Sequence, residues 1–402
     1  NARYFEFLLD NGQQIEANVT VARLPLGVTF KNSPENEKFF KYMSFLSDIG
    51  KEQKALTEDL SKASTHTDSV KVQQNMNELS RKVTAFRKDY IKQNPGTLLS
   101  NIFNALEMPP VPMVTKADGT QDTEAWYRNY KKIYWDNVAF DDERLVYTPL
   151  LDNRLDIYFS KLVMAVPDSF NADADALISK ARVSKEMFKF IVHWITKYAE
   201  ESDVMGMDAV FVHMVENYYM KGDAYWLSQE AVEKYMERAR SIAPNVIGNI
   251  GPDIKMTKMD GGEMRLSTVK AKYTLLVFWS PDCGHCLEEV PRVDSVIRAM
   301  GLEKKGLEVI AFNVDKDTSK WKNIIKEKKL ERWTHVHDAG GKSDFRAQYD
   351  VYGTPSIYML DERKIIRGKK LDHSNVGIVM EMLESNVTSK KYPLITNKIK
   401  YA

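Results

Sequence analysis

The chain has 402 residues, of which 43% are hydrophobic and 28% are charged, as is ordinary for a globular protein of about two to four domains. Its 57 basic and 56 acidic residues leave a formal net charge of +1, and no long basic run occurs, which argues against nucleic acid as a partner. The longest largely apolar run, at residues 273–279, is far shorter than the roughly 20 residues needed to cross a bilayer, so we expect no transmembrane helix.

Residues 1–30 predict a β-hairpin. Alternating runs between residues 3 and 21 surround Asn11-Gly12, a pair that favours the tight turn of a hairpin. Because a lone hairpin is only marginally stable in water, we expect this segment to be the tail of a truncated β-rich domain. The first residue is not methionine, so we expect that a segment such as a signal peptide or a lipid anchor preceded it.

Residues 31–245 predict a helical domain that begins with a helical hairpin. Apolar side chains recur at steps of three and four between residues 39 and 60 and again between residues 72 and 90, and residues 61–68 separate the two runs. This spacing is typical of two antiparallel helices. Their apolar faces can pack within the chain or serve as a dimerisation arm, and the sequence leaves both interpretations open.

Further helices are predicted after the extended, proline-rich connector at residues 108–114. Helical spacing resumes over residues 123–135, 150–166, 184–198, 208–219 and 228–241, without the fixed period of a solenoid. Two aromatic groups, at residues 126–135 and 218–226, fit packing between helices, and a groove for an unfolded or peptide substrate would use the same residue types.

Residues 243–253 contain two prolines and two glycines and predict a linker, after which the pattern becomes α/β. We expect a domain over residues 246–390 and a tail over 391–402. The predicted order is a hairpin around residues 260–262, a buried strand at 273–279, a helix at 284–300, a strand at 307–314 and a helix at 319–329. Strands at 356–360 and 365–368 and a helix at 376–387 complete the domain, and this order is that of thioredoxin.

The chain has only two cysteines, Cys283 and Cys286, and they lie three positions apart between a buried strand and a helix. At a helix N-terminus, unpaired N–H groups and the helix dipole stabilise the Cys283 thiolate. Cys286 follows one turn later, close enough to attack a mixed disulfide, and His285 adds positive charge that lowers the thiol pKa. We therefore predict a dithiol/disulfide redox centre that needs no cofactor.

Three other interpretations of these residue types are weaker. A zinc site needs two more ligands, for which His335 and His337 are the candidates, without a second cysteine pair. A purely structural disulfide across this spacing closes too small a loop to stabilise the fold much. A copper site of His213 with the methionines at 205 and 207 is disfavoured, because methionine usually fills gaps in cores. We expect no metal.

Residues 250–389 resemble the thioredoxin superfamily, and within it the TlpA-like extracytoplasmic thiol–disulfide oxidoreductases. The matching pieces are IGPDIKMTKMDGGEMRLS, LLVFWSPDCGHC, CLEEVP and YGTPSIYMLDE. The resemblance implies that Cys283 is the nucleophile and Cys286 the resolving thiol. By position it also makes Glu289 the acidic residue of the site, Pro291 a helix-kinking proline and Pro355 a cis-proline.

Two positions depart from cytoplasmic thioredoxins. Val277 occupies the place of the buried aspartate six residues before the first cysteine, so Glu289 becomes the candidate base for the buried thiol. The dipeptide between the cysteines is Gly-His, as in protein disulfide isomerases, instead of Gly-Pro.

Trp279, Thr354 and Pro355 are predicted substrate-binding residues. Trp279 borders the cysteine pair and is expected to shield it. A cis proline opposite the thiols would present backbone groups to an extended substrate, as strand addition requires.

The predicted fold class is thus α+β and multidomain, with a β-hairpin remnant, an all-α domain and a thioredoxin-like domain. The helical region resembles an uncharacterised domain found upstream of such redox domains in gut-type anaerobic bacteria. We predict an extracytoplasmic enzyme, periplasmic or anchored facing the periplasm, that exchanges disulfides with protein substrates and takes electrons from an unidentified donor. The reducing and isomerising directions both stay open.

Two alternative functions compete with this prediction. A thiol peroxidase is disfavoured, because the threonine that peroxidases place ahead of their cysteine is missing. A redox-switched scaffold would use the helical region to bind a partner, with the redox domain as its switch.

Overall fold

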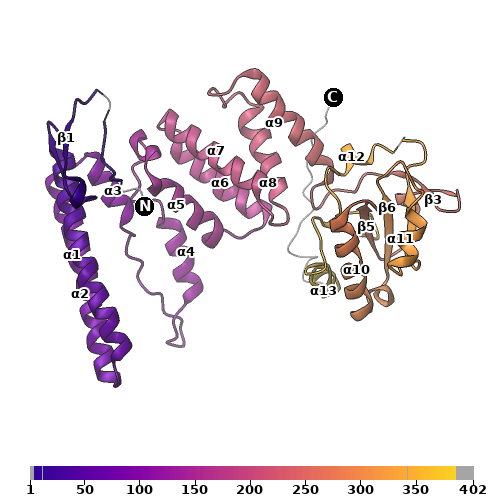
Figure 1. Cartoon of the computed structure of the whole chain (residues 1–402), viewed down its shortest axis with the longest axis horizontal. Coiled ribbons are helices and arrows are strands. Elements are labelled where there is room, and N and C mark those ends of the chain that lie inside the picture. Colours follow the sequence, from indigo (N-terminus) through magenta and orange to yellow (C-terminus); the bar gives the residue numbers. More distant parts are fainter. Residues whose placement is uncertain (1–3, 11, 342, 386–402) are drawn as a thin grey trace. The chain divides into compact units, whose positions relative to one another are not determined.

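The computed structural model describes residues 4–10, 12–341 and 343–385, and Figure 1 shows the chain as helices and strands coloured along the sequence. The described residues form two compact units. One comprises residues up to 162 together with 177–190, and the other comprises residues 163–176 and those from 191 onward. Among the described helices, none combines the length and the apolar character that a membrane crossing requires.

The first unit begins with a small antiparallel hairpin of β1 (Glu16–Val19) and β2 (Val28–Lys31). A hairpin is therefore present, but the prediction that residues 3–10 pair with residues 14–21 was wrong. The backbone N–H and carbonyl of Leu8 both bond to the side chain of Asn36, at 2.7 and 2.6 Å, so this segment is tied to the following helix. The predicted turn includes Asn11, which lies outside the described residues.

The predicted helical hairpin is confirmed. Helix α1 (Pro34–Lys62) and helix α2 (His66–Gln93) are antiparallel, since Lys38 near the start of α1 bonds to Asn94 at the end of α2. Both pack against α3 (Leu98–Leu106), which the sequence pattern did not reveal because it is only nine residues long. The buried core of this region comprises Tyr42, Tyr90, Leu99 and Phe103.

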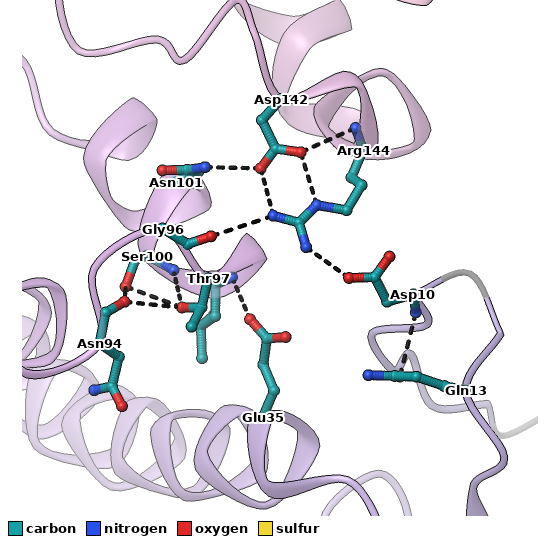
Figure 2. Close-up of polar contacts among 11 residues, drawn as sticks. Asp10, Gln13, Glu35, Asn94, Gly96, Thr97, Ser100, Asn101, Asp142 and Arg144 are labelled. Atoms are coloured by element: carbon teal, nitrogen blue, oxygen red, sulfur yellow. Dashed lines mark hydrogen bonds and ion pairs between the residues drawn. The ribbon is translucent and has the colours of Figure 1, made fainter.

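A polar cluster around Arg144 ties three segments of the first unit together (Figure 2). Arg144 Nη1 lies 2.6 Å from the Asp10 carboxylate, and its Nε lies 2.7 Å from Asp142. Asn101 of α3 donates to the same Asp142 at 2.7 Å. The N-terminal segment is thus fixed to α3 and to the short helix η2 (Glu143–Tyr147) by charge-assisted hydrogen bonds.

The remaining helices of this region match the predicted spans closely, except that α6 was not predicted. Its sequence, PDSFNADADALISKA, offers few large apolar residues at helical spacing. Two helices pass into short π-helical turns, η3 (Tyr158–Leu162) and η4 (Val215–Tyr219). The helices are α4 (Thr123–Ile133), α5 (Pro149–Ile157), α6 (Pro167–Ala181), α7 (Lys185–Glu201), α8 (Met207–Met214) and α9 (Gln229–Ile242).

A seven-stranded sheet with the order β4-β3-β7-β6-β5-β8-β9 forms the C-terminal part of the second unit. Its strands are β3 (Lys255–Lys258), β4 (Glu263–Arg265), β5 (Tyr273–Trp279), β6 (Leu307–Asn313), β7 (Thr334–His337), β8 (Ser356–Asp361) and β9 (Ile366–Gly368). The helices beside it are α10 (Gly284–Ala299), α11 (Trp321–Glu327), α12 (Phe345–Gln348) and α13 (Val376–Glu384). The predicted thioredoxin-like order is confirmed, and only β7 and α12, each four residues long, were not predicted.

Strand β5 lies inside the sheet, parallel to β6 and antiparallel to β8, and all seven of its residues are buried. Leu275, Val277 and Trp279 face one hydrophobic core, while Leu276 and Phe278 face the other. Side chains on both faces therefore fix this strand. A short turn connects the carboxyl end of β5 to the cysteine pair, so this rigid strand supports the two thiols.

Candidate active site

The two cysteines lie where β5 ends and α10 begins. Ser280, the first residue after the strand, holds the connecting turn, since its hydroxyl donates to Asp315 at 2.6 Å and accepts the Asp282 N–H at 3.0 Å. Cys283 is the N-cap of α10, and its Sγ accepts the backbone N–H of Cys286 at 3.2 Å. Cys283 is partly exposed, whereas Cys286 is fully buried, so only the first sulfur can meet a substrate directly.

The surroundings move the pKa values of the two thiols apart. Burial acts to raise the pKa of Cys283, but hydrogen bonds from the side chains of Cys286 and Thr354, and from the N–H groups of Cys286 and His285, bring it below its ordinary value. Burial, together with the hydrogen bond to Cys283, raises the pKa of Cys286 to about 12. At neutral pH the exposed sulfur is thus the one suited to be a thiolate, and the buried sulfur keeps its proton.

The loop before β8 lies against the exposed sulfur. Cys283 Sγ donates to the carbonyl of Thr354 at 3.3 Å, and the Thr354–Pro355 peptide bond is cis. Both loop residues are partly exposed. The structure therefore brings Thr354 and Pro355 to the nucleophile across 71 residues of sequence. Their role in holding a substrate stays a prediction.

Trp279 is buried in the core, whereas His285 lies at the surface. Trp279 is 1% exposed and packs in the core that includes Cys286. Its predicted contact with a substrate is not available, because the ring has no free surface. Its role as a shield for the sulfurs stays a prediction. His285 is exposed, and its backbone N–H is the group that helps to lower the pKa of Cys283.

Glu289 lies one turn after Cys286 on α10 and is 5% exposed. Its Oε1 accepts the backbone N–H of His373 at 2.7 Å, and the His373 Nδ1 lies 2.8 Å from Oε1 and 3.0 Å from Oε2. The His373 side chain is 42% exposed, so it connects a buried carboxylate to solvent. No local pattern indicated this partner, because the two residues are 84 positions apart and meet only when the loop before α13 folds onto α10.

The geometry does not support zinc binding by the cysteines with His335 and His337. Both histidines lie on β7, where His335 Nε2 bonds to the Leu330 carbonyl at 2.8 Å and the rings of both histidines pack against Trp321. Within the described ranges, the only three potential ligands that converge are Glu289, Asp372 and His373.

That group does not form an evident metal centre either. The Asp372 carboxylate accepts the N–H groups of Ser374 and Asn375, and Glu289 is occupied by His373. These bonds account for the arrangement without an ion.

Two family descriptions match the chain. Residues 247–369 match the AhpC/TSA family, and residues 61–245 match a domain of unknown function, DUF5106. The second match covers most of the predicted helical domain, and it supplies no activity.

Among curated proteins, the thiol-disulfide oxidoreductase ResA of Geobacillus kaustophilus is 34% identical over 128 residues, which are 30% of this chain and 70% of that protein. ResA of Bacillus thuringiensis is 28% identical over 116 residues, or 29% of this chain and 64% of its own length. The chain thus spans just under two thirds of that relative. A crystal structure of a thioredoxin-like protein from Bacteroides caccae has a TM-score of 0.56 at 19% identity, over 69% of this chain and 98% of the other, and shows a shared fold.

Proposed function

The chain belongs to the thioredoxin-fold thiol-disulfide oxidoreductases, and from that premise we propose that it exchanges disulfides with polypeptide substrates through Cys283 and Cys286. One observation carries the proposal: a partly exposed thiol with a lowered pKa lies at a helix start, next to a buried thiol whose pKa is raised to about 12. The first thiol is suited to attack a substrate disulfide. The second thiol stays protonated until the mixed disulfide has formed, as stepwise exchange requires.

The exchange proceeds through a mixed disulfide. The Cys283 thiolate attacks one sulfur of a substrate disulfide, the substrate S–S bond breaks, and the other substrate sulfur leaves as a thiolate. Cys286 then loses its proton and attacks Cys283 Sγ, which releases the second substrate sulfur and leaves a Cys283–Cys286 disulfide. The substrate gains two electrons and the protein loses them, so a thiol donor must reduce the pair again.

Glu289 is the proposed acceptor of the Cys286 proton. Val277 is buried where an acid would otherwise stand, and Glu289 lies on the same face of α10 as Cys286. A proton accepted by this carboxylate can pass to His373, which is bonded to it and partly exposed. The buried thiol thereby gains a route for its proton to solvent.

We further propose that the protein acts outside the cytoplasm, in the periplasm or anchored facing it. Its resemblance to TlpA-like oxidoreductases supports this placement. The redox domain is proposed to extend over residues 246–390, and the helical domain over residues 31–245. The boundaries of the two compact units do not coincide with these proposed domain boundaries, because α8 and α9 pack with the redox domain.

Turnover of insulin disulfides with dithiothreitol tests the proposal. The wild-type protein should catalyse reduction, and Cys283→Ser should abolish it because the nucleophile is gone. Absence of catalysis by the wild type, together with tight binding of a partner, would favour the redox-switched scaffold instead. Hydrogen peroxide in place of insulin tests the thiol peroxidase alternative, for which we expect no turnover.

A further inference from the structure

A polar pocket of about 300 Å³ lies beside the Thr354-Pro355 loop within the second unit. Pro355 and Ser356 line one side, and residues from the end of α7, from α8 and from α9 line the other. Thr354, the neighbour of Pro355, has its carbonyl 3.3 Å from Cys283 Sγ. The pocket lining therefore includes Pro355, the residue directly after the one that contacts the reactive sulfur.

Two ion pairs hold these helices at the pocket, one of them buried. Lys369 is 4% exposed, and its Nζ lies 2.5 Å from Asp208 of α8 and 2.5 Å from the Asn245 side chain. Arg238 of α9 pairs with Asp350. A buried charge is costly unless it is paired, so the Lys369–Asp208 contact opposes separation of α8 from the redox domain. The exposed Arg238 adds a weaker tether between α9 and Asp350. The helices form a fixed wall of the pocket.

The pocket carries both signs of charge in equal number. Its acidic residues are Glu200, Asp208 and Asp350, and its basic residues are Arg238, Lys369 and Lys370. Two acidic and two basic members pair with each other, as described above. Glu200 and Lys370 are exposed at its edge, and the Lys370 ammonium also bonds to the Ser202 carbonyl at 3.0 Å.

These charges determine which kind of ligand fits. An apolar side chain bound in this pocket would displace water from the charged groups and would offer them no hydrogen bonds in return, so its binding would be unfavourable. A segment with its own acidic and basic side chains can replace them and align with Lys370 and Glu200. A substrate in extended conformation advances about 3.3 Å per residue, so residues next to its cysteine reach the pocket while the sulfur is at Cys283.

We propose that this pocket binds the residues that flank the reactive cysteine of a polypeptide substrate, and that it favours flanks carrying both an acidic and a basic side chain. The inference rests on the proposed disulfide exchange and adds its substrate class. It also gives the last helices of the helical region a role, because they supply one wall of the recognition site.

Two synthetic peptides test this inference on the full chain. Both carry one cysteine as a disulfide with the same chromophoric thiol, and its neighbours are lysine and glutamate in one peptide and leucine and valine in the other. The wild type should reduce the charged peptide with a kcat/KM about threefold to tenfold higher, as expected for two exposed ion pairs. The double variant Glu200→Gln with Lys370→Gln should lose this preference, mainly through KM.

Glu201→Gln is the matched control, since Glu201 follows Glu200 on α7, is exposed and does not line the pocket. It should keep the wild-type preference. Equal rates for the two peptides in the wild type, or an undiminished preference in the double variant, would overturn the inference while the proposed exchange stands. Failure of the wild type to reduce either peptide would instead overturn the proposed function, and the inference with it.

Discussion

The buried carboxylate of Glu289 accepts the backbone N–H of His373 at 2.7 Å, and the His373 Nδ1 lies 2.8 Å from the same oxygen. The pair joins the helix that carries both thiols to the loop that precedes α13. Since Glu289 follows Cys286 by one helical turn, this link connects the interior beside the resolving thiol with the protein surface.

Replacing Glu289 by glutamine should slow the resolution of the mixed disulfide by about a hundredfold, the usual size of a general-base effect. The substitution keeps the shape of the side chain and removes the negative charge. Removal of a nearby negative charge should also lower both thiol pKa values. Quenched single-turnover experiments measure the resolution rate. Glu288→Gln, on the exposed side of α10, is the control, and equal rates in wild type and Glu289→Gln would refute the role of Glu289.

His373→Ala should slow resolution less than Glu289→Gln does, because the backbone N–H at position 373 still binds the carboxylate. The variant removes the imidazole whose Nδ1 contacts the carboxylate, and it leaves the proton without its exposed carrier. We expect the loss to be partly restored by added imidazole, a readout that a merely structural role would not move. Failure of imidazole at any concentration to raise the rate would count against a proton route through His373.

Alkylation of the reduced protein by iodoacetamide should begin at lower pH than for a free thiol. Because the pKa of Cys283 is lowered, its thiolate is populated below the ordinary thiol value of about 8.5, and the rate should rise through a midpoint below it. Cys286, with a pKa raised to about 12, should remain unmodified at neutral pH. Mass spectrometry locates the label. A midpoint for Cys283 at the free-thiol value would remove the case for an activated nucleophile.

Two substitutions distinguish the effect of the His285 backbone N–H on the pKa of Cys283 from the effect of the His285 imidazole. His285→Pro removes both, so the pKa of Cys283 should rise and the redox couple should shift to a more negative potential, because the reduced form loses stabilisation. His285→Ala keeps the N–H and removes only the ring. Equilibration with glutathione measures both potentials. If alanine shifts the potential as far as proline does, the imidazole carries the effect and not the backbone.

Much of the redox domain could be predicted from the sequence, because its decisive signals are local. The apolar run at residues 273–279 and the adjacent Cys283 and Cys286 identify a buried strand that ends in a redox pair. The contact of Thr354 with Cys283 is distant in sequence, and only the family resemblance anticipated it.

The contacts that were missed depend on tertiary folding. His373 meets Glu289 only after the loop before α13 closes, and no periodicity encodes that meeting. In the same way, β1 pairs with β2 while the backbone of Leu8 bonds to the Asn36 side chain, and alternation alone does not show either contact. Trp279 looked like a residue at the edge of the site, but packing on both faces of β5 buries it.

In the proposed exchange, Cys283 attacks the substrate disulfide and Cys286 resolves the product. Intact-mass spectrometry of Cys286→Ser, incubated with a disulfide-bonded peptide, tests this division of roles. We expect a stable adduct of one peptide thiol on Cys283, and no adduct on the Cys283→Ser variant. A Cys283→Ser variant that traps the peptide on Cys286, or a Cys286→Ser variant that forms no adduct, would contradict it.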